Sequence, residues 1–80
     1  MSTIQDFIRL KVAETLGINS EDVNPDEEFM SLGLDSMHAI FLLHEIEKEY
    51  DVEINPHSFW EHPTINSFSV NLEKQLAAKS

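Results

Sequence analysis

The sequence predicts a small all-α protein, a four-helix bundle with three longer helices and one short helix. Apolar residues recur at helical spacing in three separate stretches, glycine and proline separate those stretches, and none shows the strict alternation of a strand. Eighty residues without an internal repeat are enough for one domain, residues 1–80. We therefore expect helices packed around one apolar core.

The first helix is predicted over residues 3–16. Ser2 and Gln5 stand three residues apart and match a capping box, in which two side chains satisfy free N–H groups of the first turn. Gly17 suits the end of the helix because glycine adopts the left-handed conformation without strain. The buried stripe of this helix repeats every four residues and comprises Ile4, Ile8, Val12 and Leu16.

Residues 18–34 form a long connection. Pro25 and the acidic run 26–28 argue against a continuous helix, although residues 20–23 suit a single helical turn. Connections of this length are usually functional or disordered, and spaced apolar residues favour an ordered one. The expected anchors to the core are Ile18, Val23, Phe29 and Leu32.

The second long helix is predicted from Ser36 to about Tyr50, a run without glycine or proline. At ~100° per residue, one sector forms the core face, with Ala39, Leu42, Leu43, Ile46 and Tyr50. Apolar residues also occupy the outward side, where contiguous apolar patches often mark binding sites. The candidate docking residues in and before this helix are Leu34, Met37, Ile40, Phe41, His44 and Glu47.

Two further helices complete the bundle. Asn55 followed by Pro56 suits the start of a short helix over residues 56–60, with Trp60 packed at a helix junction. Thr64 can cap a last helix that runs to about residue 76. The expected core residues of this part are Val52, Ile54, Phe59, Ile65, Phe68, Leu72 and Leu76.

The composition excludes several functions. Fifteen acidic against five basic residues give a formal net charge of -10, which repels nucleic acid and favours partners with basic surfaces. The chain has no cysteine, so it has no disulfide, no thiol nucleophile and no cysteine-based metal site. No apolar stretch approaches the ~20 residues of a membrane span, and no signal peptide is evident. We expect a cytoplasmic monomer, and the absence of a Pro/Ala-rich linker favours a free-standing protein.

The sequence Gly33-Leu34-Asp35-Ser36-Met37 places an exposed hydroxyl at the start of the second long helix. Asp35 and Ser36 are both favoured helix caps. The free N–H groups and the dipole of a helix N-terminus also stabilise a phosphate. The simpler interpretation is an ordinary capped helix whose serine carries nothing.

Neither catalysis nor metal binding fits the residues. Ser36 lies outside the Gly-x-Ser-x-Gly pattern, and His38 diverges from it on a helix, so the pair cannot act as nucleophile and base. The pairs His38/His44 and His57/His62 lack the spacing that puts two ligands on one helix face. We predict no catalytic residues, no metal site and no enzyme activity.

Two segments resemble acyl and peptidyl carrier proteins, and the resemblance extends from about Ile4 to Leu76. The first is Phe29-Met30-Ser31-Leu32-Gly33-Leu34-Asp35-Ser36-Met37 with its following helix, and the second is Phe59-Trp60-Glu61-His62-Pro63-Thr64-Ile65. The resemblance implies 4′-phosphopantetheine, derived from coenzyme A, on Ser36, with Asp35 and Gly33 contributing to its attachment. Ser31 stands where many relatives carry an acid and Met37 where leucine is usual, which bears on partner choice.

The resemblance also implies partners and cargo. The partners would be a phosphopantetheinyl transferase, an acyl-loading ligase or acyltransferase, and a ketosynthase or other condensing enzyme. The cargo would be acyl intermediates of fatty-acid, polyketide or related secondary metabolism, held as thioesters. An aminoacyl or peptidyl carrier of a non-ribosomal peptide pathway shares the same evidence. An unmodified helical interaction module is the third alternative.

Overall fold

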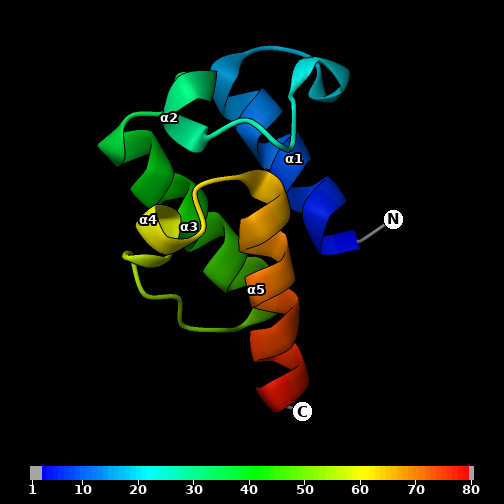
Figure 1. Cartoon of the computed structure of the whole chain (residues 1–80), viewed down its shortest axis with the longest axis vertical. Helices are drawn as coiled ribbons and strands as arrows, with labels where there is room; N and C mark the ends of the chain where they lie inside the picture. Colours follow the sequence, from blue (N-terminus) through cyan, green and yellow to red (C-terminus); the bar gives the residue numbers. More distant parts are fainter. Residues whose placement is uncertain (1–2, 80) are drawn as a thin grey trace.

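The computed structural model describes residues 3–79 as a set of helices without a strand among them (Figure 1). The all-α prediction is confirmed, and an additional short helix lies in the predicted 18–34 connection. None of the helices between residues 3 and 79 combines the length and the apolar character needed to cross a membrane. The elements are α1 (Thr3–Leu16), η1 (Ser20–Asp22), α2 (Phe29–Leu32), α3 (Ser36–Tyr50), α4 (Ser58–Glu61) and α5 (Ile65–Lys79).

The ends of the long helices follow from local sequence. Gly17 has φ +72° and lets the Ile18 N–H donate to Ala13 O at 3.0 Å, which closes the last turn of α1. The predicted cap at Ser2 lies outside the described residues. At the start of α5, the Ser67 N–H donates to Thr64 Oγ1 at 3.1 Å and the Thr64 N–H donates to Ser67 Oγ at 3.2 Å. This reciprocal cap confirms Thr64, and α5 runs beyond the predicted end at residue 76.

The core draws on every element except η1, and the predicted stripes of α1, α3 and α5 face it. Val23, Phe29, Val52, Ile54 and Phe59 are buried as predicted, and Leu32 packs partly buried against them. Two expectations are wrong. Ile18 is exposed because it follows the αL turn at Gly17 and leaves the α1 surface, and Trp60 is 66% exposed instead of packed at a junction.

Three phenylalanines fix the short helices to the bundle. The ring of Phe29 in α2 meets Phe59 in α4 edge-on at 5.1 Å between centroids, and meets Phe68 in α5 at 5.9 Å. Phe59 and Phe68 stack at 5.0 Å. The Phe29 N–H also donates to Pro63 O at 2.8 Å. Because these contacts come from distant parts of the chain, α2 depends on tertiary packing and carries no local helix signal.

The short helix α4 begins two residues later than predicted. Asn55 starts a turn instead of capping the helix directly, because its Oδ1 accepts from the His57 N–H at 2.9 Å and its carbonyl accepts from the Ser58 N–H at 2.9 Å. Pro56 occupies this turn, where its fixed φ is well accommodated. The turn leads into α4, which lies near the first half of α3, because Phe59 and Trp60 line one cavity together with Ala39.

Candidate functional site

Ser36 is the first residue of α3, and its position depends on the turn between α2 and α3. Gly33 ends α2 with φ +108°, a conformation that L-amino acids with a side chain rarely adopt. The N–H of Leu34 then donates to Phe29 O at 3.2 Å, and its side chain is buried. The chain emerges with Asp35 and Ser36 both exposed, and the turn that joins α2 to α3 lies at the left edge of the molecule in Figure 1. Buried Leu34 thus anchors a turn that presents the Ser36 hydroxyl to solvent.

Asp35 is the N-cap of α3, as predicted. Its Oδ1 accepts from the His38 backbone N–H at 2.8 Å and lies 2.9 Å from His38 Nδ1. The hydrogen bond from the His38 backbone lowers the pKa of the Asp35 carboxyl below its usual value. Asp35 is therefore a carboxylate at neutral pH. The helix end that would stabilise a phosphate on Ser36 already holds one negative charge, next to the His38 imidazole.

The candidate docking residues do not all have the same environment. Met37 is 82% exposed, Phe41 is 60% exposed, and Ile40 and His44 are also exposed, so these side chains are accessible to a partner. Leu34 is only 2% exposed and belongs to the core, so its prediction as a docking residue is wrong.

Glu47 has a structural task in addition to any docking role. It is half-buried, and its Oε2 accepts from the Ile54 N–H at 2.9 Å. This bond closes the connection after α3, where Asp51 takes the left-handed conformation at φ 53°. Glu47 therefore fixes residues 51–54 against α3.

Met30 and Trp60 line a cavity that borders α3, and sequence reasoning missed both as site residues. They line a cavity of about 300 Å³ between α2, α3 and α4, together with Ala39, which lies about one helical turn after Ser36. The Trp60 indole is exposed at this cavity. A four-residue helix gives too little periodicity to show which of its faces points outward, so no sequence signal identified Trp60.

A metal-binding cluster of side chains would be another chemistry for this site. Among residues 3–79, no three histidine, aspartate or glutamate side chains gather as a metal site would require. What the site presents is an exposed primary hydroxyl at a helix N-terminus, followed in α3 by the exposed apolar side chains of Met37 and Ile40. Such a hydroxyl can accept a phosphate ester while the surrounding surface receives an enzyme.

A helical bundle with an exposed serine at the start of its central helix is the architecture of a carrier domain. Residues 6–69 match the family model described as "Phosphopantetheine attachment site", and the chain belongs to this family of carrier proteins. The group attached in this family is 4′-phosphopantetheine. The residues present fit it, because Ser36 is exposed, begins α3 and has no bulky neighbour that buries it.

Two solved structures share both the fold and about a third of the sequence. A free-standing peptidyl carrier protein from a secondary metabolic pathway of Acinetobacter baumannii has a TM-score of 0.87 and 33% identity, covering 91% of each chain. BlmI, a type-II acyl carrier protein of Streptomyces verticillus involved in bleomycin biosynthesis, has a TM-score of 0.83 and 32% identity, covering 91% of this chain and 86% of BlmI.

Curated relatives include much larger proteins. Polyketide synthase PksL of Bacillus subtilis (strain 168) is 28% identical over 75 residues, which is 94% of this chain and 2% of PksL. The chain therefore corresponds to a small part of such relatives. It is a carrier domain with a phosphopantetheine attachment site, and polyketide synthases are among the proteins that contain a similar segment.

Proposed function

We propose that this chain, as one carrier domain, holds acyl intermediates on a 4′-phosphopantetheine arm attached to Ser36 and does not itself catalyse a reaction. The observation that carries the proposal is the exposed Ser36 at the first position of α3, inside the family match. Ser20, Ser31, Ser58, Ser67 and Ser69 also lie inside the match, but none begins a long helix after an aspartate cap.

The chain's own residues prepare the hydroxyl for transfer. Gly33 and buried Leu34 fix the turn, Asp35 caps α3, and Ser36 lies exposed at the first position of the helix. In the active site of a phosphopantetheinyl transferase, the Ser36 oxygen attacks the β-phosphate of coenzyme A, loses its proton and displaces 3′,5′-ADP, which gives a phosphodiester. The terminal thiol of the arm supplies the thioester chemistry that this cysteine-free chain lacks.

The partner enzymes would dock on the apolar surface beside Ser36. Met37 and Ile40 project from α3, and Met30 and Trp60 border the adjacent cavity. Aromatic residues and methionine are enriched where proteins bind each other. We expect a transferase, a loading ligase or acyltransferase, and a condensing enzyme to use this surface in turn.

The cargo is proposed to be acyl because polyketide synthases and a type-II acyl carrier protein are among the relatives. The similarity to a free-standing peptidyl carrier protein supports an aminoacyl or peptidyl cargo as the second candidate. Intact mass spectrometry of the protein purified from its native source distinguishes them. An arm with an acyl group supports the first candidate, and an arm with an aminoacyl group supports the second. A chain without an arm, while the pathway is active, contradicts both.

A further inference from the structure

The connection between η1 and α2 lies against the start of α5 and is bonded to it at two points. The Asn66 N–H donates to Pro25 O at 3.0 Å, and the Phe29 N–H donates to Pro63 O at 2.8 Å. An antiparallel bridge lies between these two bonds. The two segments therefore run side by side in opposite directions, and hydrogen bonds hold the pairing at both of its ends.

The Phe29 end of this pairing is connected to the segment before Ser36. The carbonyl of Phe29 accepts from the Leu34 N–H at 3.2 Å, across the four-residue helix α2. Leu34 is buried, and Asp35 and Ser36 follow it directly, both exposed. The position of Phe29 therefore helps to determine the position of the turn that presents the Ser36 hydroxyl.

The other end of the pairing is fixed by the side chain of Asn66, which is half-buried. Its Nδ2 donates to Asp26 Oδ1, and its Oδ1 accepts from Gln5 Nε2. Because a carboxylate only accepts hydrogen bonds, the NH₂ group of Asn66 must face Asp26, which leaves the amide oxygen for Gln5. We call these two side-chain contacts the Asn66 clamp. It joins α5, α1 and the connection before α2.

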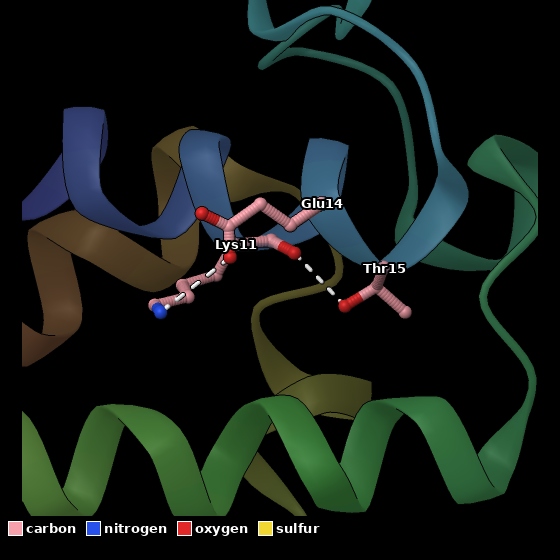
Figure 2. A network of polar contacts seen from close by, with 3 residues as sticks. All are labelled: Lys11, Glu14 and Thr15. Atoms are coloured by element: carbon pink, nitrogen blue, oxygen red, sulfur yellow. Dashed lines mark hydrogen bonds and ion pairs between the residues drawn. The ribbon is translucent and has the colours of Figure 1, made fainter.

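Other polar contacts of α1 do not join elements in this way. Figure 2 shows Lys11 paired with Glu14 at 3.6 Å and Thr15 donating to Lys11 O at 2.9 Å, so these contacts lie inside α1. A contact within one helix cannot fix that helix against another segment. The Asn66 clamp can, because Gln5 bonds from α1 to a side chain of α5.

We propose that Asn66 is a positioning residue for the transfer of the arm to Ser36, although it lies on a different helix. The clamp fixes the connection at Asp26, the paired segments extend from there to Phe29, and Phe29 fixes the turn before Ser36. Transfer depends on the geometry of the attacking hydroxyl, and a misplacement of about 1 Å can cost on the order of 100-fold in rate. The inference rests on the assignment of the arm to Ser36 in the proposed function.

The test exchanges the donor and the acceptor of one hydrogen bond. Asn66→Asp removes the amide donor and places a second carboxylate against Asp26, so the clamp opens. Adding Asp26→Asn to Asn66→Asp restores a donor and an acceptor at the wild-type net charge, and an oxygen at position 66 can still accept from Gln5. The double variant should therefore close the clamp again.

Arm transfer is measured with coenzyme A, Mg²⁺ and a phosphopantetheinyl transferase of broad specificity, at a temperature at which all variants are folded. For Asn66→Asp we expect kcat to fall about tenfold, because the hydroxyl is misplaced in the bound complex. KM for the chain should stay within about twofold of wild type, because the docking residues are unchanged. The double variant should recover the wild-type kcat. Asp26→Ala, which opens the clamp without a change in α5, should lower kcat in the same direction.

Gln75→Glu is the matched control. Gln75 also lies on α5, and its Nε2 donates to Glu53 O at 2.7 Å, so this variant loses an amide donor and gains the same charge as Asn66→Asp. The bond it loses holds the connection after α3, which does not lead to Ser36. Gln75→Glu should transfer the arm at the wild-type rate, even where its melting temperature falls as much as that of Asn66→Asp.

Amide ¹H and ¹⁵N chemical shifts provide a readout that does not require arm transfer. The shifts of residues 33–36 should change in Asn66→Asp, return in the double variant and stay unchanged in Gln75→Glu. Wild-type transfer by Asn66→Asp, no recovery in the double variant, or an equal loss in Gln75→Glu would each overturn the role of Asn66. A wild type that accepts no arm would instead count against the carrier function, and the shifts at residues 33–36 would still decide whether Asn66 fixes the turn.

Discussion

Gly33 is the residue that turns the chain from α2 into the segment before Ser36. Its φ of +108° is costly for any residue with a Cβ. There is room for the Cβ itself, because its nearest neighbour would be Leu16 Cδ2 at 3.6 Å, an ordinary van der Waals distance. The effect of a substitution is therefore backbone strain and not a clash. Ser36 is exposed at a defined place because this turn is fixed.

We predict that Gly33→Ala lowers the free energy of unfolding by ~1–2 kcal/mol, the usual cost of a left-handed conformation. It should also slow arm transfer, because the Asp35–Ser36 segment shifts. Gly17→Ala is the matched control, since Gly17 has φ +72° with nothing within 4 Å of the added methyl group. It should be destabilised similarly but accept the arm at the wild-type rate. Equal transfer rates for both variants would show that the turn does not position Ser36.

Asp35 links helix capping to pH. Its pKa is lowered in the folded state by the hydrogen bond from His38, so its contribution to stability is present above the unfolded pKa and is lost as pH falls through the folded pKa. Asp35→Asn keeps the capping oxygen without the charge. Wild type should melt at a higher temperature than Asp35→Asn at about pH 5, and this difference should become smaller as the pH is lowered to about 2. A constant difference over that range would contradict a charged cap.

At the scale of the elements, the buried face of α3 stabilises the fold, and its exposed residues are available to bind partners. Leu42 and Ile46 are almost fully buried, so alanine at either position removes burial and leaves a cavity. We predict a loss of ~2–5 kcal/mol in the free energy of unfolding for these variants. Met37→Ala and Ile40→Ala should change it by about ±0.5 kcal/mol or less.

The exposed residues Met37 and Ile40 should affect arm transfer and acyl loading instead of stability. Arm transfer or acyl loading should be slower in Met37→Ala and Ile40→Ala, because both side chains belong to the proposed docking surface beside Ser36. Thermal unfolding and arm transfer are measured on the same four variants. Met37→Ala and Ile40→Ala with transfer and loading at the wild-type rates would remove these residues from the docking surface.

The long helices could be predicted from sequence because their signals are local. The bounds of α1 and α3 follow from Gly17, from Asp35 and from stripes of apolar residues that repeat over several turns. The helix α2 could not be predicted, because Phe29 is held by Pro63, Phe59 and Phe68, which are distant in sequence.

The part of the candidate site that depends on local sequence was predictable, and the part that depends on packing between distant segments was not. Asp35 and Ser36 lie at a helix start that local pattern defines, and the structure places both there. The burial of Leu34 and the exposure of Trp60 depend on how α2 and α4 pack, which the pattern does not contain. The surface around Ser36 therefore emerges only from the three-dimensional structure.

At the scale of the whole molecule, the charge of -10 should determine how fast partners arrive. Screening shortens the Debye length from ~10 Å at ~0.1 M salt to ~3 Å at ~1 M. We predict that the association rate with a phosphopantetheinyl transferase, followed by stopped-flow fluorescence of Trp60, falls steeply over this range. A rate that does not depend on salt would mean that apolar contacts alone guide the encounter.

The central claim is that the bundle exists to present Ser36 for modification. The direct test is intact mass after incubation with coenzyme A, Mg²⁺ and a phosphopantetheinyl transferase of broad specificity. Wild type should gain one phosphopantetheine, and Ser36→Ala should gain none. Ser31→Ala is the control, since it removes another exposed serine, in α2, and it should gain the group as wild type does. Wild type without the added mass, or Ser36→Ala with it, would contradict the assignment.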